Sequence, residues 1–267
     1  MEGVIRSERI FQWRRVEEGN FRRLGDQHAS MADWASNILS FAYGPVSFFL
    51  LLKHDLTMEN RDFATGVLFP TLLDSLINAA SLGLLIFATS PISGGHINPL
   101  ITIGTFFSQL TTFPRAVLYV ICQITGATIA GFLIRAALGR HSGPIPGCWI
   151  DPSVITAGEA VVLETMTCVA LIFIVYGAGI DPRRGAIYGP ALGPLLIGLT
   201  LGLCTFVTGA LKPGYTGASL HPARCFGLMA AVGRWDLHWV HWVGAIVAGA
   251  FNAMVHGACV PGKPRGM

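Results

Sequence analysis

Two short motifs in the chain place a polar side chain directly before a proline. The first reads SGGHINPL over 93–100 and the second reads TGASLHPA over 216–223. Because proline suits the first position of a helix, Asn98 and His221 are expected at helix starts. A helix start presents unpaired N–H groups and carries about half a positive charge. The chemistry indicated is hydrogen bonding to a neutral solute with repulsion of cations, and no motif indicates an enzyme.

Apolar stretches accompany both motifs, but they are too short to cross a membrane. At about 1.5 Å per residue, 98–109 and 221–232 would each cover roughly half of the ~30 Å hydrocarbon core. Longer stretches, which reach the roughly 20 apolar residues of a span, occur at 33–52, 66–90, 114–138, 156–179, 186–210 and 238–260. The sequence therefore predicts an all-α membrane protein with six transmembrane helices and two re-entrant half-helices.

The composition agrees with this topology. Hydrophobic residues make up 52% of the 267 residues and charged residues only 12%, whereas a soluble domain carries about 25% charged residues. The net charge of +3 is too small to indicate nucleic acid as a partner. No histidine or cysteine spacing indicates a metal site, and no glycine-rich phosphate loop is present. We expect neither a metal nor a cofactor.

The two motifs also occupy equivalent places, each after the second span of a set of three. Because three is odd, the second copy of this repeat should be inverted in the membrane, so that the half-helices meet near the midplane. Arginines within the first 30 residues indicate a cytoplasmic N-terminus. Because six is an even number of spans, the C-terminus is then cytoplasmic as well. The predicted organisation is a cytoplasmic extension over 1–30, a channel domain over 31–262 with inverted repeats at about 33–138 and 156–260, and a cytoplasmic tail over 263–267.

With these motifs the chain resembles the aquaporin, or major intrinsic protein, family. SGGHINP is similar to the family's first signature loop, and HPAR at 221–224 to its second, with His221 in place of asparagine. Further matches are Gln123, Glu164 and DPRRG at 181–185. HPARC, together with Leu100, is most similar to the X-intrinsic protein branch. The resemblance implies a homotetramer in the lipid bilayer of the plasma membrane, each protomer with a passive pore for water or small uncharged solutes.

The resemblance assigns the pore to the two signature motifs, at Asn98, Pro99, Leu100, His221, Pro222 and Ala223. Asn98 would present its amide donor to the solute while backbone holds its oxygen, or it would serve only as a helix cap. Burial and the two helix dipoles favour an uncharged His221 at neutral pH. Three interpretations of His221 stay open: an altered but working pore, a pH-gated or narrowed pore, and a non-conducting aquaporin-like protein.

Arg224 lies one helical turn past His221, where the family has the arginine of its selectivity filter. A lone arginine within a membrane is costly, which favours this functional role; an inter-subunit ion pair is the alternative. Matching without gaps puts Asn78, Gly209 and Ala218 at the other three filter positions. None of these side chains is aromatic, so the constriction is expected to be wide and polar. It should pass solutes larger than water, such as glycerol, urea, hydrogen peroxide or undissociated boric acid.

The remaining candidates are expected to support the pore. The resemblance makes Asp33, Glu164 and Gln123 structural, with the two acids accepting hydrogen bonds from the re-entrant loops. Cys148 and Cys225 fall on the same, oxidising side of the membrane, which is compatible with a disulfide or with two free thiols.

Histidines and tryptophans gather at the start of the last predicted span. We interpret His238 and His241 as part of an interfacial belt, formed with Trp235, Trp239 and Trp242. A rival class, the ion- or proton-coupled transporters, would need buried titratable pairs in mid-span, and Glu164 alone supports that class weakly.

Overall fold

The computed structural model describes residues 68–138, 148–180, 182–209, 211 and 214–259. Everything said below about the structure refers to these residues. Several predictions lie outside them: the extension over 1–30, the first span at 33–52 with Asp33, and the tail over 263–267. For DPRRG at 181–185 the structure describes only the helical backbone from 182 onward.

Seven α-helices form the described part of the chain, which contains no strand beyond an isolated bridge between Ile150 and Tyr215. They are α4 (Leu68–Ser93), α5 (Pro99–Phe107), α6 (Phe113–Leu138), α7 (Ala157–Ile174), α8 (Pro182–Thr208), α9 (Pro222–Val232) and α10 (Trp239–Cys259). The predicted all-α fold class is confirmed. Four stretches are long and apolar enough to cross a membrane: Thr71–Ser90, Phe113–Ala136, Ala157–Ile180 and Ala191–Thr208.

Local signals explain where these helices begin and end. Thr156 and Glu159 form a capping box at the start of α7, each side chain bonding the backbone of the other. The predicted span at 156–179 is one continuous helical rod, since a π-helical stretch, Val175–Ile180, follows α7 directly. Helix α9 ends at Gly233, whose left-handed φ of 81° is easily adopted by glycine.

The two predicted half-helices are present as α5 and α9, of 9 and 11 residues. Each has proline in its first turn and a polar cap residue in front of it. The residue before each cap has a positive φ, 52° at Ile97 and 55° at Leu220. A positive φ is rare for any residue but glycine and rarer still for β-branched isoleucine. The backbone therefore repeats the same unusual turn in both halves of the chain.

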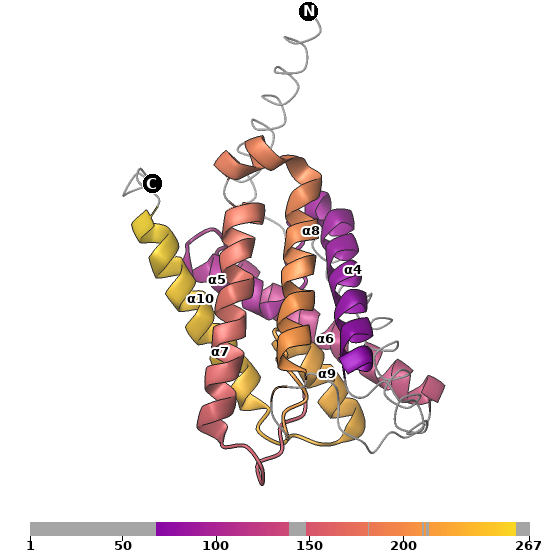
Figure 1. Cartoon of the computed structure of the whole chain (residues 1–267). Helices are drawn as coiled ribbons and strands as arrows, with labels where there is room; N and C mark the ends of the chain where they lie inside the picture. The colour runs from indigo at the N-terminus through magenta and orange to yellow at the C-terminus, as the bar shows by residue number, and fades with distance from the viewer. Residues whose placement is uncertain (1–67, 139–147, 181, 210, 212–213, 260–267) are drawn as a thin grey trace, which may run out of the picture.

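The long helices pack in pairs that bring the half-helices into the bundle. Helix α4 packs along α8, and α10 packs along α7; Figure 1 shows α7, α8 and α4 running side by side. The half-helix α9 packs against α6, and α5 packs against α10. Each half-helix is thus held by a long helix from the opposite half of the sequence.

The side chains are distributed as expected in a lipid environment, with polar groups inside and apolar groups outside. Leu84 is 69% exposed, Phe113 66% and Met254 67%. In contrast, several polar side chains are almost fully buried: Asn78, Asn98, Gln123, Glu164, His221, Arg224, His241 and Asn252. Buried polar groups require partners, so this set marks where the structure has a specific polar interior.

Glycines allow the closest of these helix contacts. Helix α8 approaches α4 at Gly202, where an added Cβ would lie 2.7 Å from the Ser75 carbonyl oxygen. Helix α9 approaches α6 at Gly227, where an added Cβ would overlap the backbone carbonyl of Ala127. Backbone atoms cannot move aside as a flexible side chain can, so these positions exclude any larger residue.

We therefore expect Gly227→Ala to destabilise the protein by about 1 to 3 kcal/mol, the usual cost of overpacking a core. The measurement is the thermal unfolding midpoint of the purified protein in detergent, followed by tryptophan fluorescence. The matched control is Gly158→Ala, because nothing lies within 4 Å of a Cβ at Gly158. Equal midpoints for the two variants would contradict the backbone contact between α6 and α9.

Candidate functional site

The starts of the two half-helices are in direct contact through Asn98. Its side-chain oxygen accepts a hydrogen bond from the Leu100 backbone at 2.9 Å and so caps α5. Its amide nitrogen donates to the carbonyl of Leu220 at 2.7 Å, across 122 residues of sequence. The backbone holds the side-chain oxygen as expected, and one N–H group of the amide is engaged by the opposite loop.

His221 caps α9 as Asn98 caps α5. Its Nδ1 accepts a hydrogen bond from the backbone of Arg224 at 3.1 Å. Because a backbone N–H can only donate, Nδ1 carries no proton, and the ring in this geometry is the neutral Nε2–H tautomer. The histidine thus occupies the site of the second cap and caps α9 as Asn98 caps α5.

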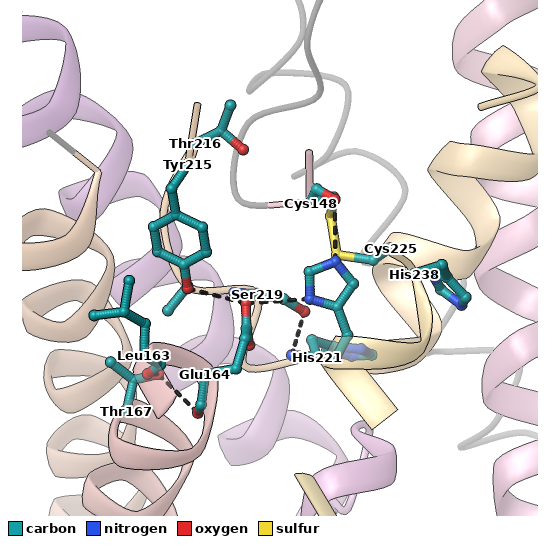
Figure 2. Close-up of polar contacts among 12 residues, drawn as sticks. Cys148, Leu163, Glu164, Thr167, Tyr215, Thr216, Ser219, His221, Cys225 and His238 are labelled. Carbon is teal, nitrogen blue, oxygen red and sulfur yellow. Dashed lines mark hydrogen bonds and ion pairs between the residues drawn. A yellow bond between two sulfur atoms is a disulfide. The ribbon is translucent and has the colours of Figure 1, made fainter. Parts of the chain in front are cut away.

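Glu164 holds the extended loop that leads to the second cap. Its side chain is 0% exposed. One carboxylate oxygen, Oε1, accepts hydrogen bonds from the Ser219 backbone at 2.8 Å and from the Tyr215 hydroxyl at 3.1 Å. Figure 2 shows Tyr215, Ser219 and Glu164 gathered in this way beside His221. The carboxylate, from α7, therefore fixes the loop that precedes α9.

His241 also reaches Glu164, and its placement corrects the prediction of an interfacial belt. It is 1% exposed, with Nδ1 3.1 Å from Glu164 Oε1 and Nε2 3.0 Å from the Cys148 carbonyl oxygen. His238 packs with the predicted aromatic neighbours instead and accepts a hydrogen bond from the Trp242 indole at 3.0 Å. The neighbouring tryptophans suggest a membrane interface, but the His241 ring on α10 faces the interior.

Arg224 is 6% exposed, and its guanidinium lies 3.4 Å from the Ser219 carbonyl oxygen. The other predicted filter positions lie on neighbouring segments. The Ala218 backbone donates to the Thr208 hydroxyl at 2.9 Å, and Gly209 follows Thr208 at the end of α8. Asn78 lies on α4 and is 4% exposed. The next residue, Ala79, is where α4 packs against Gly202 of α8.

The first half-helix has its own supports. Gln123 from α6 donates to the Thr102 hydroxyl at 3.1 Å, and Thr102 in turn donates to the Asn98 carbonyl at 3.2 Å. Leu100 is fully buried, and Pro99, Pro222 and Ala223 are buried as well. The signature residues of both motifs therefore form interior structure at the half-helix starts.

Cys148 and Cys225 form a disulfide with an S–S distance of 2.05 Å. The bond joins the segment before α7 to the first turn of α9, as Figure 2 shows between the labelled Cys148 and Cys225. Of the two arrangements compatible with the sequence, the structure has the bonded one. Cys122, Cys168 and Cys204 are free thiols.

The segment that carries Cys148 pairs with the loop before α9. The Trp149 backbone donates to the Thr216 hydroxyl at 3.1 Å, and the Asp151 backbone donates to the Gly214 carbonyl at 2.7 Å. Hydrogen bonds from the Ser153 side chain and backbone lower the pKa of Asp151. This carboxyl group is therefore ionised at neutral pH and leaves a negative charge on the segment between Cys148 and α7.

Known proteins are similar to this chain in sequence and in fold. Residues 48–256 match the family model described as major intrinsic protein. Aquaporin TIP4-1 of Zea mays is 35% identical over 184 residues, which are 68% of this chain and 68% of that protein. Aquaporin TIP1-2 of Musa acuminata is 31% identical over 230 residues, 85% of this chain and 84% of that protein. The X-ray structure of the aquaglyceroporin from Plasmodium falciparum has a similar fold, with a TM-score of 0.65, 15% identity, and coverage of 86% of this chain and 97% of that one.

Proposed function

This chain belongs to the major intrinsic protein family, and from that premise we propose that it passes uncharged solutes larger than water through a pore between its two half-helix starts. As a member of the family it is an integral membrane channel for water or small solutes and not an enzyme. The finer proposal concerns which solutes pass and which residues select them. We name glycerol, urea, hydrogen peroxide and boric acid as candidates.

One observation carries the proposal: the hydrogen bond from the Asn98 amide to the Leu220 carbonyl, at 2.7 Å. It puts the positive ends of α5 and α9 against one another, where they repel cations and protons without hindering neutral molecules. An amide has two N–H groups, so the second N–H of Asn98 can serve a solute. Irregular backbone at membrane depth is tolerated where it lines such a conduit.

The proposed filter is formed by Asn78, Gly209, Ala218 and Arg224. Arg224 supplies the only charge of the set and is held at Ser219. The other three positions carry a small amide, a hydrogen and a methyl group. Without an aromatic ring to close the gap, the constriction is sized for a polar solute of a few heavy atoms.

A narrowed or non-conducting pore is the second candidate, and His221 is the observation that favours it. A neutral imidazole has one N–H group, against two in the asparagine that the family has here. The buried pair of Glu164 and His241 is also the kind of group that a proton-coupled transporter requires, but the family gives no precedent for coupling.

The assembly and location are further parts of the proposal. We propose a homotetramer in the plasma membrane, with both termini cytoplasmic and the domain boundaries given above. The resemblance to the X-intrinsic branch rests on HPARC and Leu100 alone. Light scattering of the purified protein in detergent should give the mass of four chains, and a fluorescent fusion should label the cell boundary. A monomeric mass or an internal signal would contradict these points.

The solute preference is tested with proteoliposomes placed in an inwardly directed glycerol or urea gradient. The expected result is reswelling several times faster than that of empty liposomes, because the filter lacks an aromatic ring. For scale, a tenfold faster rate would correspond to a permeation barrier lower by roughly 1.4 kcal/mol. Urea and glycerol should both give the effect. Reswelling at the empty-liposome rate, with rapid water flux retained, would show a channel restricted to water.

A further inference from the structure

We propose that His241 is a positioning residue for the pore, which holds the second re-entrant loop and so tunes which solutes pass Arg224. The inference rests on the proposed function and deepens it. His241 is on α10, away from both signature motifs, and is buried with contacts from both ring nitrogens. Its two ring nitrogens contact Glu164 and Cys148 and not a proposed filter residue, so it acts through these neighbours.

The hydrogen bonds of His241 fix the ring on both sides. The Cys148 carbonyl can only accept, so Nε2 carries a proton and donates to it at 3.0 Å. Nδ1 then faces Glu164 Oε1 at 3.1 Å. The ring therefore bridges the two groups and cannot turn without breaking both contacts.

From Glu164 the contacts lead directly to the candidate site. The same oxygen that faces His241 accepts from the Ser219 backbone at 2.8 Å. The Ser219 carbonyl lies 3.4 Å from the Arg224 guanidinium, and the Ser219 hydroxyl accepts from the His221 backbone at 3.1 Å. A displacement of the carboxylate would therefore shift Ser219, and with it both the proposed filter arginine and the second cap.

From Cys148 a second route leads to the same place. The disulfide joins Cys148 to Cys225, the residue after Arg224. His241 therefore braces the motif at both ends, at Ser219 before it and at Cys225 after it. Such a brace specifies the position of a functional side chain more tightly than its own contacts can. Removing the ring's hydrogen bonds should loosen both ends while the fold of α10 stays intact.

The test is His241→Phe, which keeps a ring of similar size and removes both hydrogen bonds. We expect the ratio of glycerol to water permeability in proteoliposomes to rise by about threefold, because a less tightly held arginine widens the constriction. His256→Phe is the matched control: this histidine lies on the same helix and its ring stacks on Tyr176 with centroids 4.8 Å apart. The control should leave the ratio unchanged.

A second variant and a second readout keep the inference falsifiable. If His241→Phe does not assemble, His241→Gln retains a donor for one partner and should still raise the ratio. Independently of transport, His241→Phe should speed reduction of the Cys148–Cys225 disulfide by dithiothreitol, measured by alkylation and mass spectrometry. A wild type that conducts nothing would refute the proposed function alone. Unchanged permeability ratios, or an unchanged reduction rate, in the His241 variants would overturn the positioning role.

Discussion

Replacing Glu164 by alanine is expected to lower the stability of the protein by about 3 to 5 kcal/mol, the usual effect of removing one partner of a buried polar pair. The side chain is 0% exposed and its Oε1 accepts hydrogen bonds from Ser219 and Tyr215. Both donors, and the ring of His241, would be left in an apolar interior without their acceptor. Since Ser219 leads to the second cap, conduction should be lost as well. The measurements are the thermal unfolding midpoint in detergent and the water flux of proteoliposomes.

Two variants control for this result. Glu159→Ala removes an exposed carboxylate from the same helix and breaks the capping box with Thr156, which should cost about 1 kcal/mol. Glu164→Gln keeps an oxygen that can accept from Ser219 and should fall between the two. A Glu164→Ala protein as stable as Glu159→Ala would show that the loop is held in place by something other than this carboxylate.

Replacing His221 by asparagine is expected to raise the water permeability, by up to about tenfold. The expected gain follows from the number of N–H donors. His221 accepts at Nδ1 and has one N–H group. An asparagine could cap α9 with its oxygen, reach the opposite loop with one N–H and offer the other to a solute, as proposed for Asn98. One hydrogen bond is worth about 0.5 to 1.5 kcal/mol net, and about 1.4 kcal/mol corresponds to a factor of ten.

The reciprocal variant, Asn98→His, is the matched comparison for this prediction. It removes a donor from the first half-helix start and should lower the water permeability by a similar factor. Stopped-flow measurements on proteoliposomes of equal protein content would compare both variants with the wild type. A loss of conduction in His221→Asn, with normal assembly, would mean that the histidine has a dedicated role in the pore.

Much of the fold could be predicted from the sequence because its signals are local. Apolar length identified the long helices α4, α6, α7, α8 and α10. Proline after a polar cap, followed by a short apolar stretch, identified α5 and α9. The conformation of the turn before each cap could not be predicted this way. Isoleucine and leucine avoid positive φ, and the tertiary contacts of the two loops override that preference at Ile97 and Leu220.

The contacts of the candidate site depend on how the two halves meet, which no local pattern specifies. The hydrogen bond from Asn98 joins residues 122 positions apart, and the disulfide joins residues 77 positions apart. His241 was misplaced because neighbouring tryptophans suggest a membrane interface. A better signal was present in its helix: His241, Ala245, Ala248 and Asn252 recur at helical spacing, and all four are buried. Small and polar residues in one stripe indicate a packed face and not a lipid-facing one.

The central claim is that the two half-helix starts meet in a pore that conducts neutral molecules. Its most direct test is the osmotic water permeability of proteoliposomes containing the purified full-length chain, measured by stopped-flow light scattering over a range of temperatures. The account predicts shrinkage faster than that of empty liposomes, with a weaker temperature dependence, because water crosses a preformed pore instead of the lipid. Shrinkage at the rate and with the temperature dependence of empty liposomes, from correctly inserted protein, would contradict it.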